Sequence, residues 1–84
     1  MNLMAIAKLG IRLGQSSTTS DSGQPMRREW EELAARAGET TRTQDTVFAD
    51  AYYVGWTADR PSLRWQRRRY VAALNAAVGA QVAS

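Results

Sequence analysis

The sequence predicts an all-α fold: a small three-helix domain with an additional short N-terminal helix on a Ser/Thr-rich linker. Apolar residues recur at helical spacing in four segments, near residues 2–14, 26–37, 43–56 and 61–82. Proline stands at the start of two of these segments and glycine directly after one of them, which are the positions that helix starts and ends favour. A capping-box pair precedes the third segment.

The 84 residues allow one small domain. We expect a short apolar docking helix at residues 1–14, a flexible polar linker at 15–25 and the three-helix domain at 26–84. A chain of this length buries only about 60 to 65% of the surface that its unfolded form exposes. Cysteine is absent, so disulfides and thiolate-bound zinc cannot reinforce the core. Helix packing, a partner or self-association must then supply the stability.

The N-terminal helix presents a broad apolar surface, because the polar residues Lys8 and Arg12 fall on one side of it. Four residues of this surface are candidates for a second interface: Leu3, Ile6, Leu9 and Leu13. Three roles fit: the helix covers the domain's own core, contacts a partner, or rests on a membrane interface, where two cations give little attraction to anionic lipid.

Small residues on the same helix indicate close packing. Ala7, Gly10 and Gly14 share one side, and such residues let the backbone of another helix approach, although each glycine costs about 0.5 to 1 kcal/mol relative to alanine. The segment that follows has no apolar residue between Gln15 and Gln24. It cannot offset the entropy of ordering and therefore predicts the flexible linker.

The segment 26–37 is bounded by Pro25 and Gly38, as the N-terminal and C-terminal ends of a helix favour. Glutamate and arginine alternate four residues apart on one side, which is typical of a solvated face without a function. The apolar stripe is expected to pack on the core: Met26, Trp30, Leu33, Ala34 and Ala37.

The segment 43–56 follows Thr41 and Gln44, whose spacing matches a capping box. Three aromatic residues, Tyr52, Tyr53 and Trp56, crowd its end. They fit either a ligand site or the core, and the core is the commoner role in so small a chain. The expected inner face consists of Val47, Phe48, Ala51, Val54 and Gly55.

The last segment, 61–82, is long for this chain, at about 33 Å for a rise of about 1.5 Å per residue. Asp59 is available as a cap and Pro61 suits the first turn. One side is apolar through Tyr70 and Leu74. The alanines on the remaining surface favour close packing against another helix, either internally or across a dimer.

Charge is segregated along the chain. Residues 1–59 carry six cationic and eight anionic side chains, whereas residues 60–84 carry five arginines and no acidic residue. Cations near a helix N-terminus oppose the helix dipole, so an uncompensated cluster there needs an explanation. The candidate partner-binding residues are Arg60, Arg64, Trp65, Arg67, Arg68 and Arg69.

Three interpretations of this cluster stay open. In the structural one, the arginine stems cover Trp65 and Tyr70, and the neighbouring helix neutralises them through its glutamates. In the second, the guanidinium groups dock onto an acidic protein partner. In the third they bind nucleic acid, where only Ser62 and Gln66 could read bases, so that phosphate contacts would dominate. The glutamates that the structural interpretation requires are Glu29, Glu31, Glu32 and Glu39.

No catalytic or metal-binding signature is present in the sequence. The absence of histidine and cysteine removes the commonest general base, the usual metal ligands and the thiolate nucleophile. Asp45 and Asp50 are five residues apart and Glu31 and Glu32 are adjacent, so neither pair forms a same-face dyad. We therefore expect no enzyme activity, no cofactor and no metal.

The apolar start of the chain predicts neither a signal peptide nor a membrane span. Its continuous apolar run, residues 3–7, has five residues, and Lys8 and Arg12 interrupt the apolar pattern beyond it. A signal core needs about 7 to 15 apolar residues and a span needs about 20. We expect a soluble, cytoplasmic protein.

The expected function is that of a small non-enzymatic interaction protein that docks its arginine-rich helix onto an acidic protein partner. Its size is common among accessory subunits and phage or mobile-element proteins. One alternative is a sequence-indifferent nucleic-acid-binding protein that uses the same basic face. Another is a structural subunit that self-associates into a homo-oligomer or a larger assembly through its alanine face or its N-terminal helix.

Overall fold

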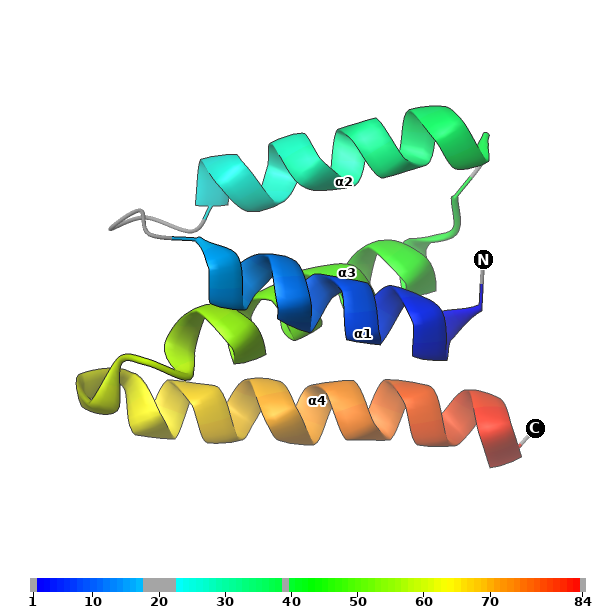
Figure 1. Ribbon diagram of the computed structural model, residues 1–84. Coiled ribbons are helices and arrows are strands. Elements are labelled where there is room, and N and C mark those ends of the chain that lie inside the picture. The colour runs from blue at the N-terminus through cyan, green and yellow to red at the C-terminus, as the bar shows by residue number, and fades with distance from the viewer. Residues whose placement is uncertain (1, 18–22, 39, 84) are drawn as a thin grey trace.

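The computed structural model of the chain describes residues 2–17, 23–38 and 40–83 and confirms the all-α fold. No strand occurs within these ranges. The helices are α1 (Leu3–Ser16), α2 (Gly23–Ala37), α3 (Arg42–Thr57) and α4 (Arg64–Ala83), and a short 3-10 helix, η1 (Pro61–Leu63), precedes α4. Successive α-helices run in opposite directions, with α1 and α3 at the centre, α2 on one side and α4 on the other (Figure 1).

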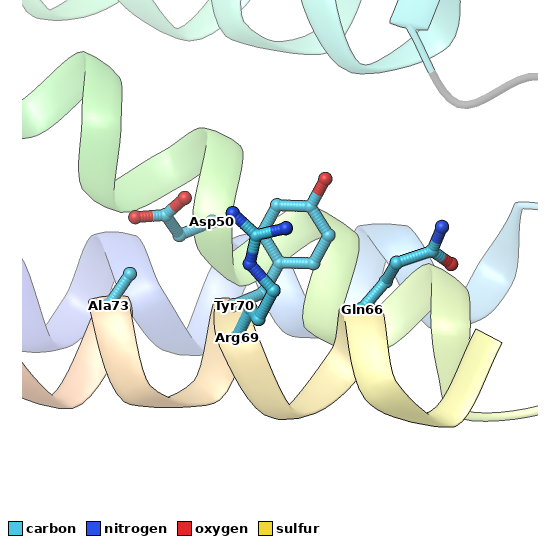
Figure 2. Close-up of a pocket in the computed structure, with 5 residues that line it drawn as sticks. All are labelled: Asp50, Gln66, Arg69, Tyr70 and Ala73. Carbon is cyan, nitrogen blue, oxygen red and sulfur yellow. The ribbon is translucent and has the colours of Figure 1, made fainter.

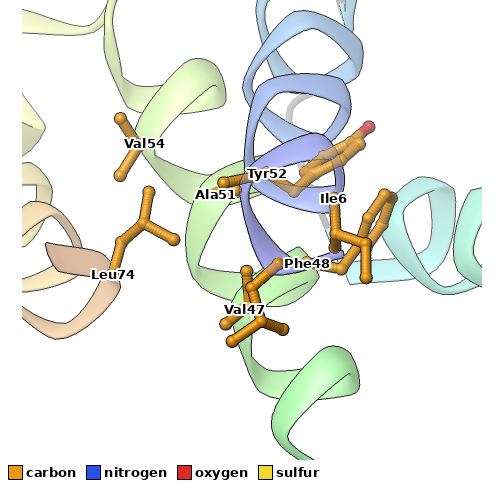
Figure 3. Packing of buried hydrophobic residues seen from close by; sticks show 9 residues of the cluster. Ile6, Val47, Phe48, Ala51, Tyr52, Val54 and Leu74 are labelled. Atoms are coloured by element: carbon orange, nitrogen blue, oxygen red, sulfur yellow. The ribbon is translucent and has the colours of Figure 1, made fainter. Parts of the chain in front are cut away.

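The core lies between α1, α3 and α4. Figure 3 shows Ile6 of α1 beside Phe48 of α3, and Leu74 of α4 beside Val54 of α3. Since α3 is central, it supplies most of the buried side chains, as its predicted inner face requires. The core consists of Leu3, Ile6, Ala7, Val47, Phe48, Ala51, Tyr52, Val54 and Leu74.

Small residues let α1 and α3 approach until their backbones touch. A β-carbon added to Gly10 would lie 2.8 Å from the β-carbon of Ala51, and one added to Gly14 would lie 2.8 Å from the backbone nitrogen of Trp56. Atoms in a packed interior do not come so close, so larger residues do not fit at this crossing. The close approach that the glycines predict is therefore made within the chain's own core.

The N-terminal helix thus has the first of its three expected roles. Leu3 is 5% exposed and Ile6 is 1% exposed, so neither is accessible to a partner in this fold. Leu9 and Leu13 are half-buried. A second interface that uses all four residues cannot form on the folded chain, because the side that was expected to offer it faces α3.

The outer helix is α2, which contacts the core through half-buried side chains. Trp30 stacks on Phe48 with their ring centroids 4.9 Å apart, and its Nε1 donates a 2.7 Å hydrogen bond to Oδ1 of Asp45. Met26 and Leu33 pack beside it. Three of the five residues of the predicted apolar stripe thus pack on the core, while Ala34 is half-buried without being part of it and Ala37 is exposed.

Most helix ends form as predicted. The backbone N–H of Gln44 donates to Oγ1 of Thr41 at 3.1 Å, and that of Thr41 donates to Oε1 of Gln44 at 2.9 Å, which completes the capping box. Gly38 ends α2 with a φ of 87°, the left-handed conformation that glycine adopts without strain. Asp59 does not act as the expected cap, because no side-chain hydrogen bond caps η1. Pro61 begins this 3-10 turn, and α4 starts after it.

The two ends of the expected linker are helical. α1 continues to Ser16, whose hydroxyl donates a 3.0 Å hydrogen bond to the Arg12 carbonyl oxygen. α2 begins at Gly23 and includes Pro25 in its first turn, where the missing N–H of proline costs nothing. Residues 18–22, the middle of the expected linker, lie outside the described residues.

Candidate functional site

The candidate site lies where α3 ends and α4 begins. The backbone N–H of Arg60 donates to the Thr57 carbonyl oxygen at 3.1 Å and closes the turn between them. Pro61 restricts the backbone at the start of η1. Tyr53 of α3 and Tyr70 of α4 stack with their ring centroids 4.9 Å apart. These contacts place the first turns of α4 beside the C-terminal end of α3.

Arg60 is held by Trp56 of α3. Its guanidinium carbon lies 4.1 Å from the centroid of the Trp56 ring, and its Nη1 donates a 2.6 Å hydrogen bond to the Trp56 carbonyl oxygen. That carbonyl belongs to the last turn of α3, where the helix dipole favours a cation. Arg60 therefore stabilises the end of α3. Its role is structural, but the ring that it covers is Trp56 and not the expected Trp65 or Tyr70, and it donates to a backbone carbonyl.

The other four arginines of the cluster are exposed on α4: Arg64, Arg67, Arg68 and Arg69. Among the described residues, none of the four has a carboxylate within 4.0 Å. The glutamates that were expected to neutralise them, Glu29, Glu31 and Glu32, belong to α2, which lies across α1 and α3 from α4 (Figure 1). The expected internal neutralisation by these three residues therefore does not occur. Glu39, the fourth candidate, lies outside the described residues.

Trp65 is 64% exposed in the middle of these arginines. It lines a shallow hollow of about 420 Å³ with Arg64, Arg68 and Arg69. A second hollow, of about 200 Å³, also involves Trp65 and is lined by Gln66 and Arg69. No ring or cation–π contact to the indole occurs within the described part of the chain. We call the group of Arg64, Trp65, Arg68 and Arg69 the Trp65 surface.

Arg67 does not belong to this surface. It follows Trp65 by two residues, which is a rotation of about 200° around a helix of 3.6 residues per turn, so the two side chains project to nearly opposite sides of α4. Arg67 is nevertheless exposed. The expected single basic ridge is thus divided into Arg60 at the end of α3, the Trp65 surface, and Arg67 behind it.

Asp50 brings a carboxylate to the edge of the Trp65 surface. It lines a hollow of about 240 Å³ with Gln66, Arg69, Tyr70 and Ala73, and Figure 2 shows it reaching in from α3 toward these four residues of α4. Partial burial raises the pKa of the Asp50 carboxyl, because desolvation disfavours its charged form. No hydrogen bond or ion pair to Asp50 is formed by the described residues.

A further hollow, of about 260 Å³, opens between the end of α3 and the start of α4, and we call it the aromatic hollow. It is lined by Tyr53, Trp56, Thr57, Leu63, Gln66 and Tyr70. The three aromatic residues that were expected in the core are therefore divided. Tyr52 is 1% exposed in the core, whereas Tyr53 and Trp56 are half-buried and line this hollow.

Sequence reasoning missed Asp50 and Tyr70 as residues of the site. Asp50 follows Val47 by three residues and precedes Val54 by four, and both valines are buried. The helical period thus places Asp50 at the edge of the buried stripe, and this spacing is the signal that could have found it. No such sequence signal indicates the position of Gln66, which lines the hollow with Asp50, the hollow beside Trp65 and the aromatic hollow.

Comparisons of the chain with protein-family models, curated proteins and solved structures found no match. Within the described ranges, no helix has both the length and the apolar character that crossing a membrane requires. The same residues contain no group of three or more His, Cys, Asp or Glu side chains that could hold a metal ion.

Proposed function

We propose that this chain is a small non-enzymatic interaction protein that docks the Trp65 surface onto an acidic protein partner. One observation supports it most: an indole that is 64% exposed lies among three guanidinium groups, none of which has a carboxylate of the described residues within 4.0 Å. Tryptophan and arginine are enriched among the residues that dominate binding energy at protein interfaces. Their combination on one exposed surface favours a docking role.

The arrangement opposes the preferences of the helix itself. Arg64 lies in the first turn of α4, where a cation faces the positive end of the helix dipole at a cost of about 0.3 to 1 kcal/mol. Arg64 and Arg68 are four residues apart, and no acidic residue occupies the first turn of α4. Like charges at this spacing destabilise a helix by a further few tenths of a kcal/mol, at about 0.2 to 0.5 for each pair. A partner that brings carboxylates would remove both costs on binding.

Carboxylates fit this surface by geometry as well as by charge. A guanidinium group donates two parallel hydrogen bonds to one carboxylate, and Trp65 supplies rigid apolar area beside them. The proposed role is that of an accessory subunit in a soluble, intracellular setting, a class that includes small phage and mobile-element proteins. This last comparison uses size alone.

Single-stranded nucleic acid is the second candidate, and the exposed indole is the observation that favours it. Bases stack on exposed aromatic rings while arginines follow the phosphates. The Asp50 carboxylate opens into the hollow that Arg69 also lines, but it opposes phosphates and carboxylates alike and does not decide between the two partners. Among the described residues Trp65 is the one exposed aromatic ring, whereas sites for single strands stack successive bases on several rings. We therefore prefer the protein partner.

A matched pair of neighbouring arginines tests the proposal. The probe is a dye-labelled, glutamate-rich peptide, titrated with the protein and followed by fluorescence anisotropy. Arg68→Glu changes the Trp65 surface, whereas Arg67→Glu makes the same charge change on the opposite side of α4. We expect Arg68→Glu to weaken binding by about tenfold or more, as at a binding hot spot, and Arg67→Glu to weaken it much less.

Equal losses in both variants would contradict a docking surface, because they would mean that the peptide responds to net charge alone. A labelled oligothymidine serves as the second probe. Tighter binding of the oligothymidine than of the peptide, with a slope of log K against log salt near about −2 for three phosphates, would replace the protein partner with nucleic acid.

A further inference from the structure

We infer that the aromatic hollow receives one large, uncharged apolar side chain of the acidic partner. The inference rests on the proposed function and adds what the partner segment must contain: an apolar anchor at a short distance from its acidic residues. Three features support it: the lining of the hollow, the cation already bound at its edge, and the continuity of the hollow with the Trp65 surface.

The lining of the hollow is mostly aromatic and aliphatic. Tyr53 and Tyr70 are stacked with an interplanar angle of 20°, and Trp56 and Leu63 line the same space. Its volume of about 260 Å³ is smaller than the roughly 300 to 1,000 Å³ of most small-molecule sites. A pocket of this size suits a single phenylalanine or leucine side chain, the kind of anchor that interface hot spots bury.

The charge at the edge of the hollow selects against a cationic ligand. Three aromatic rings could form a cage for a quaternary ammonium group. However, the guanidinium of Arg60 already lies 4.1 Å from the centroid of the Trp56 ring, and a second cation beside it would be repelled. No carboxylate of the described residues lines this hollow. An uncharged side chain is therefore the favoured occupant.

Gln66 connects the aromatic hollow to the Trp65 surface, because it lines this hollow and also the hollow beside Trp65 and Arg69. Both sites therefore lie on neighbouring sides of α4. The diameter of a helix with its side chains is about 10 Å, and an extended chain spans about 3.3 Å per residue. One extended segment can thus fill both sites when about three residues separate its apolar anchor from its acidic residues.

Two peptides test the inference. Both are dye-labelled and rich in glutamate; one carries a phenylalanine about three residues from its glutamates, and the other has serine at that position. Fluorescence anisotropy gives the dissociation constant of each. With the wild-type protein, we expect the phenylalanine peptide to bind about tenfold more tightly, a difference of about 1.4 kcal/mol.

Two variants of the hollow and one control variant locate the preference. Gln66→Trp places a bulky ring at the hollow and should reduce the ratio of the two affinities to about one. Asn75→Trp adds the same ring to an exposed position further along α4 and should leave the ratio unchanged. Leu63→Ser makes the lining polar without filling the space and should also reduce the ratio. Circular dichroism verifies that each variant is helical.

The outcomes separate the inference from the proposed function. Equal binding of both peptides by the wild type would overturn the anchor and leave the docking surface in place. A preference for phenylalanine that persists in both Gln66→Trp and Leu63→Ser would likewise overturn the hollow as its site. Failure of the wild type to bind either peptide would instead overturn the proposed function itself.

Discussion

Gly55 of α3 faces the carbonyl oxygen of Ile11 in α1 with no room for a β-carbon between them. A β-carbon at Gly55 would also lie 2.9 Å from the backbone nitrogen of Gln15. Gly55 immediately precedes Trp56, which holds Arg60 and lines the aromatic hollow. The contact between the two backbones therefore supports the end of α3 from which the proposed docking surface is built.

Replacement of Gly55 by alanine should destabilise the protein strongly. The added methyl group must push two backbones apart, and such overpacking costs about 3 kcal/mol where neither side can yield. Gly79 is the matched control, because it is exposed in α4 and a β-carbon there would meet no atom within 4 Å. Gly79→Ala should stabilise by about 0.5 to 1 kcal/mol. Urea denaturation measures both, and a loss in Gly55→Ala no larger than about 1 kcal/mol would contradict the backbone contact.

Arg60 and Arg68 should respond to alanine in opposite directions. Arg60→Ala removes a cation–π contact and a hydrogen bond at the end of α3, so we expect a loss of about 1 to 2 kcal/mol. Arg68→Ala removes an exposed cation near the start of α4 and should leave stability unchanged or raise it by a few tenths of a kcal/mol, up to about 0.5. Thermal denaturation at low salt compares them. If both variants lose stability equally, Arg60 and Arg68 do not have different roles, and the division of the arginine cluster is wrong.

Local patterns in the sequence predict what depends on local chemistry. The capping box of Thr41 and Gln44, the left-handed Gly38 and the proline in the first turn of α2 each need only neighbouring residues, and each forms. The small residues of α1 also predict a close helix contact. They do not say which helix makes it, because the same pattern fits a partner or the chain's own core.

The arrangement of the helices depends on contacts between distant segments, which a single sequence does not contain. Glu31 and Arg68 have opposite charges, yet α2 and α4 lie on opposite sides of the central pair, so the expected neutralisation fails (Figure 1). Arg60 is bound to Trp56 only because the turn between α3 and α4 brings them together. The hollow with Asp50 likewise arises from the packing of α4 on α3.

The hydrogen bond from Trp30 to Asp45 should couple α2 to the rest of the fold. Trp30→Phe keeps the stack on Phe48 but removes the 2.7 Å donor contact, so we expect a loss of about 1 to 2 kcal/mol for a bond to a charged group. Asp45→Asn tests the other partner, and the double variant should lose less than the sum of the two. Hydrogen exchange should show faster exchange in α2 than in α3. Strict additivity in urea denaturation would argue against the coupling.

The raised pKa of Asp50 predicts how the stability of the protein depends on pH. Partial burial raises this pKa in the folded chain. As the pH rises, the unfolded chain therefore releases its proton first. Between the ordinary and the raised pKa, the folded state binds more protons than the unfolded state. The free energy of unfolding then falls as the pH rises from the ordinary carboxyl pKa to the raised one. Asp50→Asn removes this loss of stability. The variant should therefore be more stable than the wild type above the raised pKa, and equally stable below the ordinary carboxyl pKa.

The same substitution should tighten binding of the glutamate-rich peptide. Asp50 opens into the hollow that Arg69 lines, and its negative charge opposes a carboxylate that approaches this guanidinium. Its removal should strengthen binding by about twofold to fivefold, as expected for one charge at the rim of an interface. Asp59→Asn, at an exposed position in the turn before α4, is the control with the same change of net charge. If both variants gain equally, net charge and not the position of Asp50 governs the affinity, and the proposed path of the partner past Arg69 must be abandoned.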